Sequence, residues 1–135
     1  MTLAAAALIR GVPPDRGVVD AVSAVAGRAG DEELGYLVDQ AGRARPVDGP
    51  DAGFVFFAAG IALRVVTEAR GFEEGVRSVV ALGGDTGANA AVAGALLGAL
   101  HGASALPQGW LERLDGRNEI EREAGDLADL ALRTG

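Results

Sequence analysis

Apolar side chains recur at the spacing of an α-helix along almost the whole chain, and this periodicity limits the folds that the sequence can adopt. Val18, Val22 and Val25 show the pattern near the start, and Leu127 and Leu130 show it near the end. No segment shows the convincing apolar–polar alternation of a half-buried strand. Aromatic residues make up only 4% of the chain, so alanine, valine and leucine must fill the core. We therefore predict an all-α fold, with one helical domain over residues 1–135.

Glycine, proline and charged residues divide this pattern into separate helices. We predict helices over residues 2–10, 15–28, 31–40, 52–69, 72–82, 89–101 and 119–133. Gly71 is expected to close the helix over 52–69, as the residue that follows its last turn. The run from Val79 to Leu82 could form a short strand, but it continues the helical phase of Val76. A helix is therefore favoured at that position.

Glycine is abundant, at 21 residues, and much of it lies inside the helical patterns. Each such glycine costs roughly 0.5–1 kcal/mol relative to alanine. These positions therefore need a reason in packing or in backbone conformation. Gly94 and Gly98, together with Ala91 and Ala95, form a stripe of small residues that predicts close packing of their helix.

The charge and composition of the chain disfavour several classes of function. The net charge is −7, from 19 acidic and 12 basic residues, and an acidic chain without a basic cluster is a poor candidate for binding nucleic acid or anionic membranes. The most apolar segment, 52–69, contains Arg64 and Glu68, so we expect a buried central helix and not a membrane span. Cysteine is absent, which excludes disulfides and thiolate metal sites. We expect a cytoplasmic protein.

A glycine-rich loop over residues 83–89, Gly-Gly-Asp-Thr-Gly-Ala-Asn, joins two of the predicted helices. Its simplest interpretation is structural, because glycines allow a sharp turn and Asp85 or Thr86 could cap the helix that follows. A phosphate loop is disfavoured, since the glycine spacing is not G-x-G-x-x-G and no lysine completes a P-loop. The string Asp-Thr-Gly-Ala at 85–88 also matches aspartic proteases, and residues 116–118 resemble a later motif of theirs. Those proteases need β-strands around the loop, whereas an alanine-rich helix follows it here.

The residues around this loop resemble the C-terminal signature of the ADP-ribosylglycohydrolases. In that family, Gly-Gly-Asp-Thr-Asp-Thr precedes a helix with two glycines four residues apart, followed by glycine, proline and tryptophan. The corresponding residues here are Gly83, Gly84, Asp85, Thr86, Gly94, Gly98, Gly102, Pro107 and Trp110. Upstream, residues 53–55 and 71–76 also look like elements of the family. The resemblance covers residues 50–132 and, more weakly, residues 1–45.

The resemblance implies an all-α enzyme that binds ADP-ribose with two divalent metals, usually Mg²⁺, which orient the ribose and help to activate water. In the family, three residues of this loop are metal ligands: the first Asp, the second Asp and the Thr directly after it. These positions hold Asp85, Gly87 and Ala88 here, and only Asp85 can coordinate a metal through its side chain. The resemblance further implies that the ligand-binding residues are Gly83, Gly84, Thr86 and Asn89. Thr86 is not one of the family's metal ligands.

The family's remaining metal ligands come from a Gly-Asp segment and a Thr-Asp-Asp segment, and nothing in residues 1–80 matches either. We therefore expect a truncated ADP-ribosylglycohydrolase-like protein that lacks most of the two-metal site, and this argues against hydrolysis. An ADP-ribose-like small molecule is the ligand that the resemblance implies. The alternative function is a non-catalytic helical module that forms a homodimer or binds a partner chain. Half of a helical fold would expose an apolar face that such a partner could cover.

Overall fold

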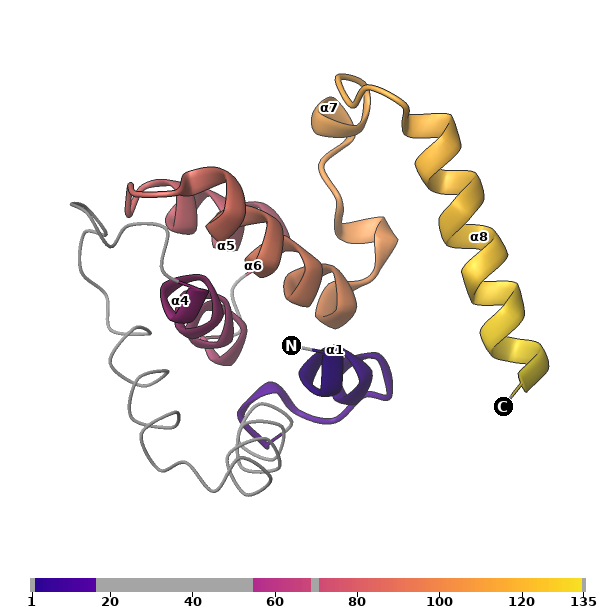
Figure 1. Cartoon of the computed structure of the whole chain (residues 1–135), viewed down its shortest axis with the longest axis horizontal. Coiled ribbons are helices and arrows are strands. Elements are labelled where there is room, and N and C mark those ends of the chain that lie inside the picture. Colours follow the sequence, from indigo (N-terminus) through magenta and orange to yellow (C-terminus); the bar gives the residue numbers. More distant parts are fainter. Residues whose placement is uncertain (1, 17–54, 69–70, 135) are drawn as a thin grey trace. The chain divides into compact units, whose positions relative to one another are not determined.

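The computed structural model describes residues 2–16, 55–68 and 71–134, which belong to two compact units (Figure 1). The first unit is Met1–Ala105 and the second is Leu106–Gly135. Every regular element in the described part of the chain is a helix, so the predicted all-α fold is confirmed. The helices predicted over 15–28 and 31–40 lie almost entirely outside the described residues. The single domain over residues 1–135 stays a prediction.

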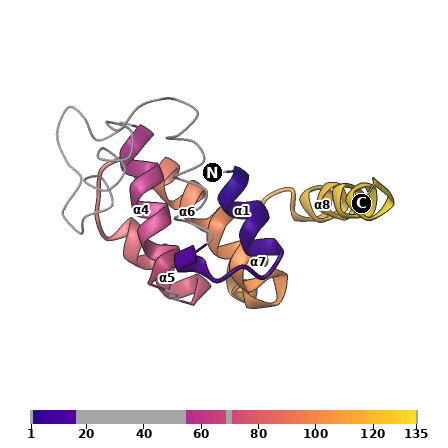
Figure 2. The ribbon, with the colours of Figure 1, turned by 90° about the horizontal axis from the view of Figure 1, so that it is seen from below.

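The first unit is built around one central helix, which contacts three others (Figure 2). The elements are α1 (Thr2–Ile9), α4 (Val55–Thr67), α5 (Phe72–Val80), α6 (Thr86–His101) and the short 3₁₀ helix η1 (Ala103–Ala105). Helix α6 packs against α1, α4 and α5. The largest side chains in the core are almost fully buried and come from α4, α5 and α6: Ile61, Val65, Val66, Val79, Leu96 and Leu97. This burial of apolar area is the main term that stabilises the unit.

Helices α5 and α6 approach closely at Gly75. A Cβ atom at this position would lie 2.6 Å from Leu97 Cδ1 and 3.0 Å from Val65 Cγ1, which is closer than carbon atoms pack. Along α6, the corresponding atoms at Gly94 and Gly98 would meet Val76 and Phe72 at 3.9 Å, in ordinary contact. The predicted close packing of α6 therefore occurs, but the glycine that it requires lies on α5.

The structure gives Gly71 a different role from the predicted one. Gly71 has φ −58° and ψ 157° and is the N-cap of α5, so its predicted role in closing the preceding helix is wrong. Its carbonyl accepts a hydrogen bond from the Gly75 N–H at 2.8 Å, as the residue before a first helical turn does. Glu73 and Glu74 follow in that turn, where carboxylates favour the helix dipole. Val79 and Val80 are the last residues of α5, so this run is not a strand, but the helix predicted to continue to Leu82 ends at Val80 and residues 81 and 82 form a turn.

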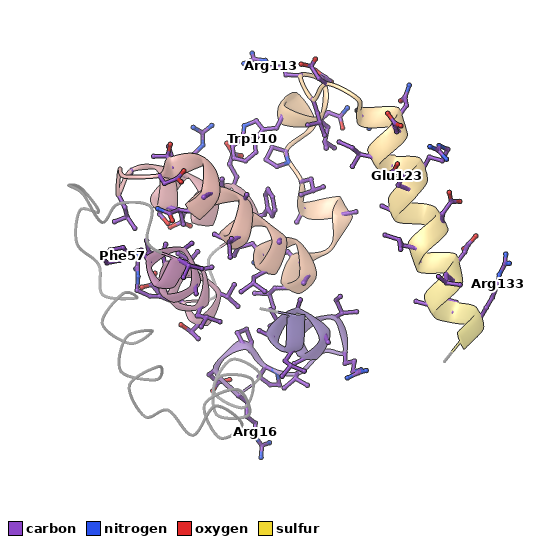
Figure 3. The ribbon with its side chains drawn as sticks, viewed as in Figure 1. Arg16, Phe57, Trp110, Arg113, Glu123 and Arg133 are labelled. Atoms are coloured by element: carbon purple, nitrogen blue, oxygen red, sulfur yellow. The ribbon has the colours of Figure 1, made fainter. Side chains whose placement is uncertain are left out.

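The second unit contains the four-residue helix α7 (Gln108–Leu111) and the long helix α8 (Arg117–Thr134). Side chains extend from all around α8, Glu123 and Arg133 among them (Figure 3). Every residue of α8 from 118 to 133 is exposed, including Ile120 and Leu127 on its apolar side. Among the helices in the described part of the chain, none is long and apolar enough to cross a membrane.

Candidate functional site

The loop between α5 and α6 is shaped by two successive glycines. Helix α5 ends at Val80, and the Gly83 N–H donates to the Val80 carbonyl at 3.2 Å to form a tight turn. Gly83 and Gly84 then adopt φ angles of +78° and +68°, a region that residues with a Cβ rarely enter. The two glycines therefore reverse the chain, and the next residue, Asp85, is placed at the start of α6.

Asp85 is the N-cap of α6. Its Oδ1 accepts a hydrogen bond from the Ala88 N–H at 3.0 Å, and its carbonyl accepts one from the Asn89 N–H at 3.0 Å. The Thr86 N–H donates to the Gly84 carbonyl at 2.9 Å. An aspartate in this position satisfies a backbone donor that has no partner within the helix, and its charge favours the helix dipole. The sequence left Asp85 and Thr86 as alternative caps, and the structure assigns the cap to Asp85.

Gly87 and Ala88, in the first turn of α6, have no polar side-chain atoms. Gly87 and Ala88 are both exposed. A Cβ atom at Gly87 would meet only Asp85 Oδ1, at an ordinary 3.7 Å, so the local packing leaves room for a side chain at this position. The local packing therefore does not require a glycine at position 87.

Asn89 differs from the other loop residues because it is buried. Only 2% of its surface is exposed, and its side-chain Nδ2 has no hydrogen-bond partner in the structure as described. An unsatisfied buried amide donor costs about 1–3 kcal/mol, so this position calls for an explanation. The sequence predicted Asn89 as a ligand-binding residue, and its polarity gave no sign that the side chain would be buried.

The predicted site residues fall into two groups. Gly83, Gly84, Asp85 and Thr86 lie together in the turn and the cap, whereas Asn89 lies in the core behind them. Within residues 2–16, 55–68 and 71–134, no three His, Cys, Asp or Glu side chains are grouped so that they could hold a metal ion. His101 is at the opposite end of α6 from the loop.

Comparison with known protein families assigns the chain to one of them. The family model for ADP-ribosylglycohydrolase matches residues 1–135, the whole chain. The chain belongs to the ADP-ribosylglycohydrolase family. No curated protein and no solved structure matches it. The resemblance found in the sequence is therefore confirmed, and this helical chain is a member of a family that is generally metal-dependent.

The side chains of this ADP-ribosylglycohydrolase loop do not fit the family's metal chemistry. Mg²⁺ requires hard oxygen ligands in near-octahedral geometry and is bound in proteins mainly through carboxylates. Between residues 83 and 89 the only carboxylate is Asp85, and one of its oxygens already accepts the Ala88 N–H. Gly87 and Ala88 contribute no side-chain oxygen, and Asn89 is buried in α6.

Proposed function

We propose that this ADP-ribosylglycohydrolase-family chain binds an ADP-ribose-type ligand at the loop over residues 83–89 and does not hydrolyse it. The observation that carries the proposal is the state of Asp85. It is the one family metal ligand that the loop retains, and it caps α6 through the Ala88 N–H at 3.0 Å. The scaffold for presenting the loop is thus kept, while the side chains at positions 87 and 88 that would complete a metal site are absent.

The shape of the loop supports binding of a sugar or phosphate ester by the backbone. Gly84 and Gly87 are exposed, and neither has a side chain that would keep a ligand away from the main chain. At the start of α6, the Thr86 and Ala88 N–H groups already donate to Gly84 and Asp85, so the Gly87 N–H is the donor that we expect a ligand to use. Thr86 adds a hydroxyl, a group that can both donate to and accept from a ribose.

Isothermal titration calorimetry with ADP-ribose tests this proposal. We expect heat of binding in the presence of EDTA, and we expect Gly87→Leu to weaken the affinity at least tenfold, since the new side chain would extend over the exposed loop. Gly109→Leu is the matched control, because Gly109 is exposed and a Cβ atom there would meet nothing within 4 Å. The absence of any heat with millimolar ADP-ribose would rule out the proposed ligand.

The apolar side of α8, which is exposed, favours a second candidate function: a non-catalytic module that forms a homodimer. Ile120, Ala124 and Leu127 are spaced i, i+4 and i+7, and therefore share one side of the helix. Ile120 is 49% exposed and Leu127 is 67% exposed. The unit that contains α8, Leu106–Gly135, is below the roughly 40 residues at which a chain without disulfides, metals or association usually folds by itself.

A second copy of this chain is the occupant that the pattern on α8 fits best. A dimer with two-fold symmetry needs a surface that is complementary to itself. If two copies of α8 pack antiparallel about an axis near Ala124, Ile120 of one copy lies beside Leu127 of the other. The small Ala124 side chains then meet at the axis and let the helices approach closely. The large–small–large pattern is therefore self-complementary in the antiparallel arrangement.

Light scattering distinguishes the dimer from a monomer. We expect a mass of twice 13.6 kDa for the unaltered chain and a single-chain mass for Leu127→Glu, since a buried glutamate without a partner is strongly disfavoured. Leu132→Glu is the matched control, because Leu132 is 82% exposed but does not share the i, i+4, i+7 spacing. A monomer with a cooperative thermal transition would contradict assembly through α8.

A further inference from the structure

Asp85 has a structural role in this chain that requires no metal. Its Oδ1 accepts the Ala88 N–H at 3.0 Å, and its main-chain carbonyl accepts the Asn89 N–H at the same distance. Helix α6 begins at Thr86 and contacts α1, α4 and α5, and Asp85 accepts hydrogen bonds from two N–H groups in its first turn. We propose that Asp85 serves in this chain as a positioning residue for α6, and that the loop over 83–89 binds no divalent cation.

Two observations beyond the cap support the absence of a cation site. First, a Cβ atom at Gly87 would lie 3.7 Å from Asp85 Oδ1. A carboxylate could therefore stand next to Asp85 at this position, and the chain has a hydrogen atom there instead. Second, the side chain of Ala88 is a methyl group, which offers no oxygen to a cation.

The cap hypothesis and the metal hypothesis make different demands on the side chain at position 85. A helix N-cap needs only an oxygen that can accept a backbone N–H, so serine serves nearly as well as aspartate, whereas alanine does not. Magnesium binding draws mainly on the charge of the carboxylate, so serine would bind Mg²⁺ much more weakly than aspartate does, and alanine would not bind it at all. The inference goes beyond the proposed ligand, because it holds whether or not ADP-ribose binds.

Thermal unfolding of three variants, each in EDTA and in millimolar Mg²⁺, tests the inference. We expect Asp85→Ala to lower Tm by about 4 °C and Asp85→Ser to keep Tm within about 1 °C of the unaltered chain, in both solutions. Asp129→Ala is the control for the loss of one exposed carboxylate away from the loop. A Tm equal to that of the unaltered chain for Asp85→Ala would overturn the capping role. A Mg²⁺-dependent rise in Tm that Asp85→Ser abolishes would overturn the absence of a cation site.

Nuclear magnetic resonance with Mn²⁺ provides a readout that does not depend on stability. Mn²⁺ takes the same oxygen ligands as Mg²⁺ and broadens the signals of nearby amide groups. We expect the amide signals of Gly87 and Ala88 to remain sharp at Mn²⁺ concentrations that leave the rest of the spectrum unaffected. Selective broadening of these two signals that disappears in Asp85→Ser would contradict the inference. That outcome would not decide whether ADP-ribose binds, which the calorimetric titration in EDTA tests separately.

Discussion

Replacing Gly75 by valine is expected to destabilise the first unit by about 3 kcal/mol, the upper part of the range for overpacked cores. The Cβ atom alone would lie 2.6 Å from Leu97 Cδ1 and 3.0 Å from Val65 Cγ1. Neither Leu97 nor Val65 has any exposed surface, so neither side chain can turn outwards to relieve the clash. Helices α5 and α6 would have to separate. Urea unfolding followed by circular dichroism measures the change in the free energy of unfolding.

A control variant and a double-mutant cycle show whether the clash at Gly75 is the cause. Gly94→Ala is the matched control, because its Cβ would meet Val76 Cγ2 at an ordinary 3.9 Å. We expect this change to be neutral or to stabilise the chain by up to about 1 kcal/mol, through the higher helix propensity of alanine. Leu97→Ala removes the atoms that a Cβ at position 75 would strike. Gly75→Ala should therefore cost less in the Leu97→Ala background than alone, and equal costs in both backgrounds would contradict the account.

The architecture of the chain could be predicted because helical periodicity reports directly on which residues face a core. The apolar segment 52–69 was predicted to form a buried helix, and the structure buries Ile61, Val65 and Val66 within it. The close contact at Gly75 could not be predicted, because it depends on which helices pack against α5 and on the residue of α5 at which they cross it. Gly71 was assigned to the end of one helix and begins the next, since glycine is compatible with both positions and only the backbone angles decide between them.

The candidate site could be predicted in part, because short-range geometry is encoded in short motifs. Two adjacent glycines followed by an aspartate indicate a turn and a cap, and Gly83, Gly84 and Asp85 form both. The burial of Asn89 had no such signal, because it follows from the packing of α6 against other helices. The roles of Gly83, Gly84, Thr86 and Asn89 in binding a ligand, and of Asp85 as a metal ligand, remain predictions drawn from the family.

Hydrolysis of the ADP-ribosyl bond by this chain is expected to be undetectable. The family's chemistry depends on metal ions, and the resemblance implies that three side chains of this loop help to bind them. Here glycine and alanine occupy two of those three positions. The third, Asp85, has an oxygen engaged by the Ala88 N–H. The loss is of side-chain oxygens and not of scaffold, because α6 and its capped start are intact. Adding Mg²⁺ should therefore restore no activity.

We propose that this ADP-ribosylglycohydrolase-family chain has kept the loop without its hydrolytic activity. The most direct measurement is the release of free ADP-ribose from an ADP-ribosylated peptide, incubated with a stoichiometric amount of the chain and millimolar Mg²⁺ and followed by chromatography. We predict no release above that of the peptide in buffer alone. Release of ADP-ribose by the unaltered chain and by Asp129→Ala, but not by Asp85→Ala, would contradict the claim.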